Sequence, residues 1–106
     1  MTVPEDILQR IVGQIVQTAK PDTIILFGSA ATGTMTADSD LDLLVVESRV
    51  SDTRRESIRI RAALSDVPLP IDIIVMSRQW FDETKDVVGG IAYPAHRYGK
   101  VLYEAA

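Results

Sequence analysis

Three aspartates at alternate positions, Asp38, Asp40 and Asp42, lead into an apolar run. The stretch Asp40–Val46 is typical of a buried strand, and burying a lone carboxylate is costly. Residues i and i+2 share one face of a strand, so Asp40 and Asp42 point the same way while the leucines beside them point into the core. Adjacent carboxylates repel when both are ionised, and Mg²⁺ prefers such oxygen ligands together with phosphate. The pattern predicts a cation site, with Asp38 in the loop before it.

Asp72 is a further candidate, because it is the only polar residue in the stretch "IDIIVM". We expect a strand over Leu69–Met76 that lies centrally in the sheet. If this strand neighbours the one over Asp40–Val46, Asp72 faces the first two carboxylates. Three carboxylates would complete a two-metal site, with ions about 3.5–4 Å apart, of the kind that supports in-line phosphoryl displacement.

The turn "FGSAATG" follows a short β-branched strand over Thr23–Phe27. Gly28 permits close approach of the backbone to a ligand, and the N–H groups of Gly28 and Ser29 are suited to phosphate oxygens. The Ser29 hydroxyl adds a donor. Gly-Ser after a strand is common turn chemistry on its own. Together with Asp40, Asp42 and Asp72 it forms a four-part pattern that indicates phosphoryl chemistry.

The elements that must position these residues follow from periodicity. We expect an α/β (α+β) domain, with helices packed on a small mixed β-sheet, over residues 1–106. A capping box of Thr53 and Glu56 predicts where the second long helix starts, and Ser77 is the expected cap of the next. The remaining expected elements are a helix from Pro4 to Ala19, a short helix in the Gly28 turn, a helical turn over Tyr93–Tyr98 and an edge strand over "GKVLYE".

Composition excludes several classes of protein. The net charge of −4 argues against a general nucleic-acid binder, which needs a surplus of Lys and Arg. There are no cysteines, which excludes disulfides and thiolate metal sites and fits a reducing cytoplasm. No apolar run approaches the roughly 20 residues of a membrane span, and acidic residues stand where a signal peptide would be basic. We therefore expect a cytoplasmic protein.

The stretch "LFGSAATGTMTADSDLDLLVV" resembles the signature of the DNA polymerase beta nucleotidyltransferase superfamily. The chain's shortness and its ending "YGKVLYE" are similar to the minimal nucleotidyltransferase branch. The resemblance implies that Asp40 and Asp42 ligate two Mg²⁺ ions. It also implies that Asp72 ligates one ion and helps to deprotonate the attacking hydroxyl, and that Gly28 and Ser29 hold the triphosphate of ATP.

The same resemblance implies a partner. Many members of this branch are antitoxins paired with a HEPN ribonuclease toxin, and those with intact carboxylates are understood to transfer AMP from ATP to a toxin tyrosine. The chain has no spare length for an acceptor domain, so the acceptor is expected on another protein. Ala30 and Thr32 stand where the family often has arginines, and Thr36 where a basic residue is frequent. These departures weaken the expected grip on the triphosphate.

Two other interpretations of the function stay open. One is an antitoxin that neutralises its toxin by binding alone, which the missing arginines favour. The other is a nucleotidyltransferase for a small molecule, completed by dimerisation. The remaining polar and aromatic residues are not expected to be catalytic, and His96 is expected to have a surface or packing role. The basic helix is expected to be solvated or to contact a partner through its arginines, Arg54, Arg55, Arg59 and Arg61. The aromatic side chains are expected to pack in the core and at edges: Trp80, Phe81, Tyr93, Tyr98 and Tyr103.

Overall fold

The computed structural model describes residues 3–36 and 38–106 of the chain. Strands and helices alternate along most of it, as the periodicity predicts. The strands are β1 (Thr23–Phe27), β2 (Leu41–Glu47), β3 (Ile71–Ser77) and β4 (Lys100–Glu104). The helices are α1 (Glu5–Ala19), α2 (Ser29–Thr32), α3 (Thr53–Ala63), α4 (Arg78–Thr84) and α5 (Ala92–Tyr98).

The strands form one sheet in the order β3-β2-β1-β4. β2 and β3 are parallel, whereas β1 is antiparallel to both of its neighbours, β2 and β4. The parallel connection passes through α3, as a parallel crossover requires. The mixed α/β sheet predicted from the sequence is therefore confirmed.

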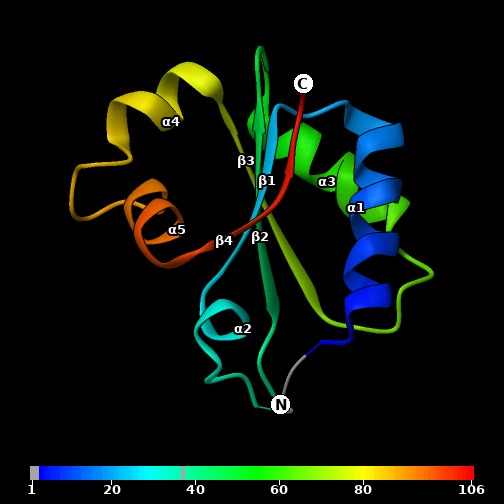
Figure 1. Ribbon diagram of the computed structural model, residues 1–106. Helices are drawn as coiled ribbons and strands as arrows, with labels where there is room; N and C mark the ends of the chain where they lie inside the picture. The colour runs from blue at the N-terminus through cyan, green and yellow to red at the C-terminus, as the bar shows by residue number, and fades with distance from the viewer. Residues whose placement is uncertain (1–2, 37) are drawn as a thin grey trace.

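Helices cover both faces of the sheet (Figure 1): α1 and α3 lie on one face, and α4 and α5 on the other. Leu43 and Val45 of β2 pack in the cluster with α1 and α3, and Leu44 and Val46 pack in the cluster of the α5 side. Alternate residues of a strand point to opposite faces, so Asp42 lies on the same side of the sheet as Leu44. The central strand is thus buried along most of its length and carries Asp42 near its beginning.

Two predicted strand positions need correction. β2 begins at Leu41, so Asp40 lies just before the strand, and β3 begins at Ile71 rather than Leu69 because the prolines preceding it lack the N–H that a ladder uses. The expectation that β3 lies in the centre of the sheet is also wrong: this strand pairs with β2 alone and forms one edge. β1 and then β4 occupy the other side of β2.

The start of α3 also differs from the prediction. Asp52, not Thr53, caps the helix, and its carboxylate accepts a hydrogen bond of 3.0 Å from the Arg55 N–H. The side chain of Glu56 bonds to Arg59 instead of reaching back to the cap. Ser77 caps α4 as expected, accepting from the Trp80 N–H at 3.1 Å. Within the described ranges no helix combines the length and apolar character needed to cross a membrane.

Candidate active site

The sheet register brings three of the predicted site residues to one end of the molecule. Asp42 on β2 stands directly beside Asp72 on the parallel strand β3. On its other side Asp42 is paired with Phe27, the last residue of β1, and Gly28 follows immediately. Partners in register point to the same face of a sheet. The two aspartates therefore share a face next to the Gly28 turn.

Gly28 is fitted to the carboxylate of Asp42. A Cβ atom at Gly28 would lie 2.3 Å from Asp42 Oδ2, so a side chain there would displace the carboxylate. The backbone of Gly28 has φ +70° and ψ −152°, a conformation that glycine adopts almost exclusively. The glycine of this turn thus lets an acidic side chain lie against main chain.

Asp42 lies close to two charges of its own sign. Its pKa is raised, first by burial and then by the neighbouring carboxylates of Asp72 and Asp40. Asp42 is half-buried, whereas Asp40 and Asp72 are exposed, and Asp38 is exposed before them. Both charged groups that shift this pKa have the same sign as Asp42. A cation between them would remove the repulsion.

The donor set fits a hard divalent cation, because it consists of carboxylate oxygens at one solvent-facing end of the sheet. In residues 3–36 and 38–106, no three acidic, histidine or cysteine side chains are arranged closely enough to hold a metal ion. Asp40, Asp42 and Asp72 as metal ligands therefore stay a prediction.

The turn after Gly28 forms the short helix α2. Its first helical hydrogen bonds are donated by the N–H groups of Ala31 and Thr32 to Gly28 O, at 3.1 and 3.3 Å. The N–H groups of Gly28 and Ser29 precede these bonds, as the leading donors of a helix do. Gly28 lies against Asp42, and Ser29 opens the helix that follows it.

Two positions where the family often has arginine are used locally. The Thr32 hydroxyl donates to the carbonyls of Gly28 and Ser29 at 3.3 and 3.5 Å and contacts Thr34 Oγ1 at 3.1 Å. Ala30 is half-buried and packs against the core. Neither side chain carries the positive charge of an arginine, so we expect the main chain of the turn to make the contacts with phosphate.

Glu47 is a buried acidic residue that sequence reasoning missed, because it closes the apolar run of β2 without any local signal of burial. Only 6% of it is exposed, and its Oε2 atom has no hydrogen-bond partner among the described residues. Burial first, then the adjacent Glu56, raise its pKa to about 8. A carboxyl group in this setting holds its proton at neutral pH.

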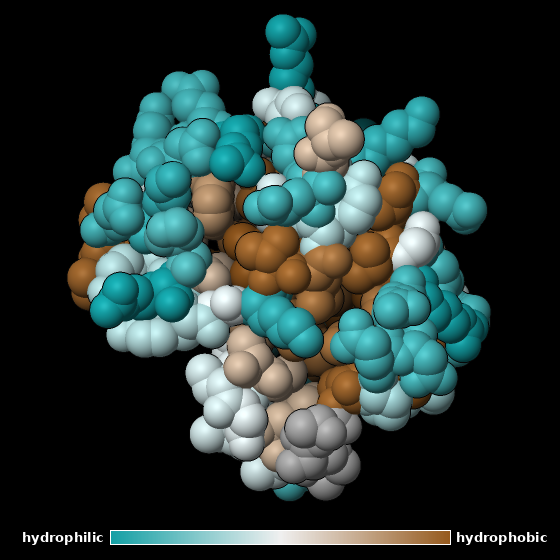
Figure 2. Space-filling model, viewed as in Figure 1, coloured by the Kyte–Doolittle hydropathy of each residue, from teal (hydrophilic) through white to brown (hydrophobic). Residues whose placement is uncertain are grey.

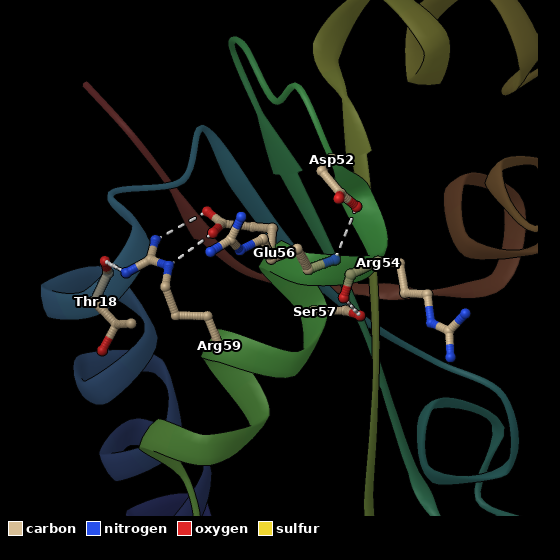
Figure 3. A network of polar contacts seen from close by, with 7 residues as sticks. Thr18, Asp52, Arg54, Glu56, Ser57 and Arg59 are labelled. Carbon is tan, nitrogen blue, oxygen red and sulfur yellow. Dashed lines mark hydrogen bonds and ion pairs between the residues drawn. The ribbon is translucent and has the colours of Figure 1, made fainter.

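Glu56 completes this second carboxylate cluster with Arg59. The Arg59 guanidinium donates two hydrogen bonds to Glu56, at 2.8 and 3.0 Å, and one to Thr18 O at 2.8 Å (Figure 3). The bond from Arg59 is the main reason why the pKa of Glu56 is lowered. Arg54 points away from this network. The arginines of α3 therefore do not form one uniform solvated face.

Some of the aromatic residues are buried and others are exposed. Phe81 is buried, and His96 meets its ring edge-on with 6.1 Å between centroids, which fits the expected packing role. The expectation of packing is wrong for Trp80 and Tyr98, whose exposed fractions are 57% and 60%. Trp80 faces solvent because α4 buries only Phe81.

Comparisons with known proteins agree with this fold. The family model of the nucleotidyltransferase domain matches residues 6–91. Among solved structures, a Sulfolobus solfataricus protein assigned to the nucleotidyltransferases has a TM-score of 0.64 at 16% identity, over 93% of this chain and 78% of that one. A mutant of the toxin–antitoxin MntA–HpeT has a TM-score of 0.67 at 17% identity, over 92% of this chain and 73% of that one. A search of curated proteins gives no significant match.

The fold and the family model define a nucleotidyl-transferring class of enzyme. Because the matched model spans most of the chain, the protein belongs to the nucleotidyltransferase domain family. The two structural neighbours show the same fold. The predicted family, fold and transferase class are confirmed.

Proposed function

We propose that the protein is an antitoxin that transfers AMP from ATP to a tyrosine hydroxyl of a HEPN-type toxin in the cytoplasm, with Mg²⁺ as cofactor. One observation carries the proposal: Asp42 and Asp72 are in register on one sheet face, and the Asp42 carboxylate lies against a glycine that opens the next helix. This arrangement puts carboxylates and main-chain N–H groups side by side, which is what a nucleoside triphosphate requires.

In the proposed reaction each residue has one task. Asp40 and Asp42 hold Mg²⁺, which supplies charge neutralisation at the phosphates when bound. The N–H groups of Gly28 and Ser29 bind the oxygens of the β- and γ-phosphates. Asp72, which also contributes a ligand, accepts the proton of the tyrosine hydroxyl.

The tyrosine oxygen then forms a bond to the α-phosphorus, and the bond from that phosphorus to the oxygen bridging the α- and β-phosphates breaks. Pyrophosphate leaves toward the Gly28 turn and AMP stays on the tyrosine. The contribution of the chain is mainly positioning and electrostatic stabilisation.

The toxin partner is supported by the structural neighbour that is itself a toxin–antitoxin protein. The local use of Thr32 and Ala30 favours a second candidate, in which the antitoxin neutralises its toxin by binding alone. The two candidates differ in whether the toxin gains mass.

Intact mass spectrometry separates them. The protein encoded by the neighbouring gene is tested as the toxin: it is incubated with this protein, ATP and Mg²⁺, with Asp42→Asn as the control. A gain of one or more AMP units that the control lacks supports the transfer. A stable complex with an unchanged toxin mass overturns it in favour of neutralisation by binding.

A further inference from the structure

The free edge of β3 is the longest regular edge of the sheet. Its seven residues pair with β2 in unbroken register from Leu41 and Ile71 to Glu47 and Ser77. The Leu41 N–H donates a hydrogen bond of 2.8 Å to Pro70 O, which shows that the main-chain groups of Pro70 point toward β2. Alternate residues direct their main-chain groups to opposite sides. Ile71, Ile73 and Val75 therefore direct theirs away from β2, toward the open edge.

Two grooves follow this edge. The first, of about 510 Å³, begins at Asp72 and is lined by Ile71 and Ile73 of the strand and by Ile58 and Arg61 of α3. The second, of about 460 Å³, continues past Val75 and includes Thr53, Trp80 and Ile91. Ile58 and Trp80, which flank the edge from the two layers of helices, are 61% and 57% exposed. Large apolar side chains thus border a strand edge able to accept another strand.

The opposite edge, β4, is protected in ways that β3 is not. β4 has five residues, its register with β1 is interrupted between Ile24 and Ile25, and Lys100 and Glu104 charge its two ends. Short length, an irregular register and charged residues are devices that discourage strand pairing. Figure 2 shows apolar residues over this side, where Leu102 and Tyr103 meet α1, but these are half-buried against the core. The unprotected edge is the one that contains Asp72.

We propose that the edge of β3 is the docking site for the partner's acceptor segment, which adds as an extended strand and brings its hydroxyl group to Asp72. This inference rests on the proposed function, because Asp72 is the group expected to receive the proton. Strand addition uses main-chain hydrogen bonds for affinity and side-chain pockets for specificity. The occupant is a partner rather than a second copy because Asp72, the residue expected to receive the proton of the acceptor, is one of the residues that line the groove.

The flanking helix indicates the chemistry of this segment. Arg54, Ile58 and Arg61 are spaced i, i+4 and i+7, so they share one face of α3. The ion pairs found among the described residues use Arg10, Arg59 and Arg78, not Arg54 or Arg61. A segment with an apolar residue over Ile58 and acidic residues on either side complements this face.

The test measures complex formation with the purified toxin encoded beside this chain, without ATP, so that binding is read independently of chemistry. Ile58→Glu and Arg61→Glu are compared with Val101→Glu on the β4 edge, a residue of similar exposure at 50%. We expect the first two to raise the Kd at least about tenfold and the third to leave it within about twofold. Hydrogen exchange adds a main-chain readout: the amides of Ile73 and Val75 should exchange at least about tenfold more slowly in the complex.

The outcomes separate the docking site from the proposed function. Unchanged binding by Ile58→Glu and unprotected β3 amides overturn the docking site, even if AMP is transferred. If only Val101→Glu weakens binding of the toxin, the interface lies at β4. If the free protein forms a dimer that Ile58→Glu dissociates, the β3 edge binds a second copy of the chain. Either result overturns the proposal. Binding through β3 without any gain in toxin mass once ATP and Mg²⁺ are added supports the docking site and contradicts the proposed transfer.

Discussion

Strand β2 carries acidic residues at both of its ends, and the surroundings of these residues differ between the two ends. At the end nearest the Gly28 turn, Asp42 faces Asp72 and Asp40, and both neighbours raise its pKa. At the other end, Glu47 shares a buried corner with Glu56, and Arg59 binds Glu56 through two hydrogen bonds. The Glu47 cluster supplies its own counter-charge, Arg59, and Glu47 keeps its proton. The Asp42 cluster has a solvent-facing side and consists of carboxylates only.

We infer that the difference separates a structural cluster from the one proposed to be functional. Where other residues of the fold compensate the repulsion between like charges, as at Glu47, we interpret the cluster as structural. A repulsion that the fold leaves in place, at a solvent-facing strand end beside a turn of main-chain donors, is kept for a ligand. If this comparison is right, substitutions at the two ends should have opposite consequences for activity and for stability.

The largest expected effect is on activity at the Asp42 end. Asp42→Asn should lower AMP transfer to the toxin by roughly 10²–10³-fold, the usual cost of removing one electrostatic group from a catalytic site. Because it also removes repulsion with Asp72, it should raise the free energy of unfolding by roughly 0.2–1 kcal/mol in the absence of divalent cations. Radiolabelled AMP incorporation and urea denaturation measure the two. An inactive variant that is also less stable would indicate a misfolded site and contradict the comparison.

Gly28 tests whether the carboxylate must lie against main chain. Gly28→Ala should reduce transfer at least about tenfold, because its Cβ would displace Asp42, and should lower the free energy of unfolding by about 1–3 kcal/mol. Gly33→Ala is the matched control, because Gly33 ends the same turn with φ +78° and a Cβ atom added there would meet nothing within 4 Å. The control should lose stability and keep its activity. Equal losses of activity in both variants would attribute the effect to backbone strain alone.

The Glu47 end should be visible in the pH dependence of stability. Its pKa is raised from 4.5 to about 8, so between these values the folded protein keeps a proton that the unfolded chain has lost. The stabilisation is complete below the lower value and decreases as pH rises through the higher one, with a slope of at most about 1.4 kcal/mol per pH unit. Glu47→Gln should flatten this part of the profile and leave AMP transfer unchanged. Urea denaturation of both proteins across this pH range measures the free energy of unfolding. If its slope against pH is the same in both proteins, Glu47 ionises freely.

The smallest effect is expected from restoring a basic residue to the turn. Thr32 is exposed, so Thr32→Arg should fold normally and bind ATP roughly three- to tenfold more tightly through a charge-assisted contact. Isothermal titration calorimetry measures the affinity. Gln17→Arg on α1 adds the same charge far from the turn and serves as the control. Equal tightening in both variants would indicate a net-charge effect rather than a contact with phosphate.

Much of this organisation could be predicted from the sequence because the signals are local. The helical stripe of α1, the β-branched run of β1 and the glycine after it depend on residues a few positions apart. The alternation of Asp40 and Asp42 likewise predicts one functional face, and the pairing of Asp42 with Asp72 follows once the two strands are neighbours.

Other features could not be predicted, because they depend on contacts between distant segments. The edge position of β3 is decided by where β1 and β4 pair, and nothing in "IDIIVM" distinguishes an edge strand from a central one. The protonated state of Glu47 depends on its burial and on Glu56 from another element. The exposure of Trp80 depends on how α4 is turned. The cap of α3 differs by one residue from the prediction because Asp52 and Thr53 are both good capping residues.

The two ends of β2 can be compared most directly in one assay. Initial rates of AMP transfer from ATP to the toxin are measured for Asp42→Asn and Glu47→Gln beside the unmodified protein, at one pH where all three are folded. We predict a loss of at least about 100-fold for Asp42→Asn and less than about threefold for Glu47→Gln. Near-normal transfer by Asp42→Asn, or an equal loss in both variants, would contradict the claim that only the Asp42 end is kept for chemistry.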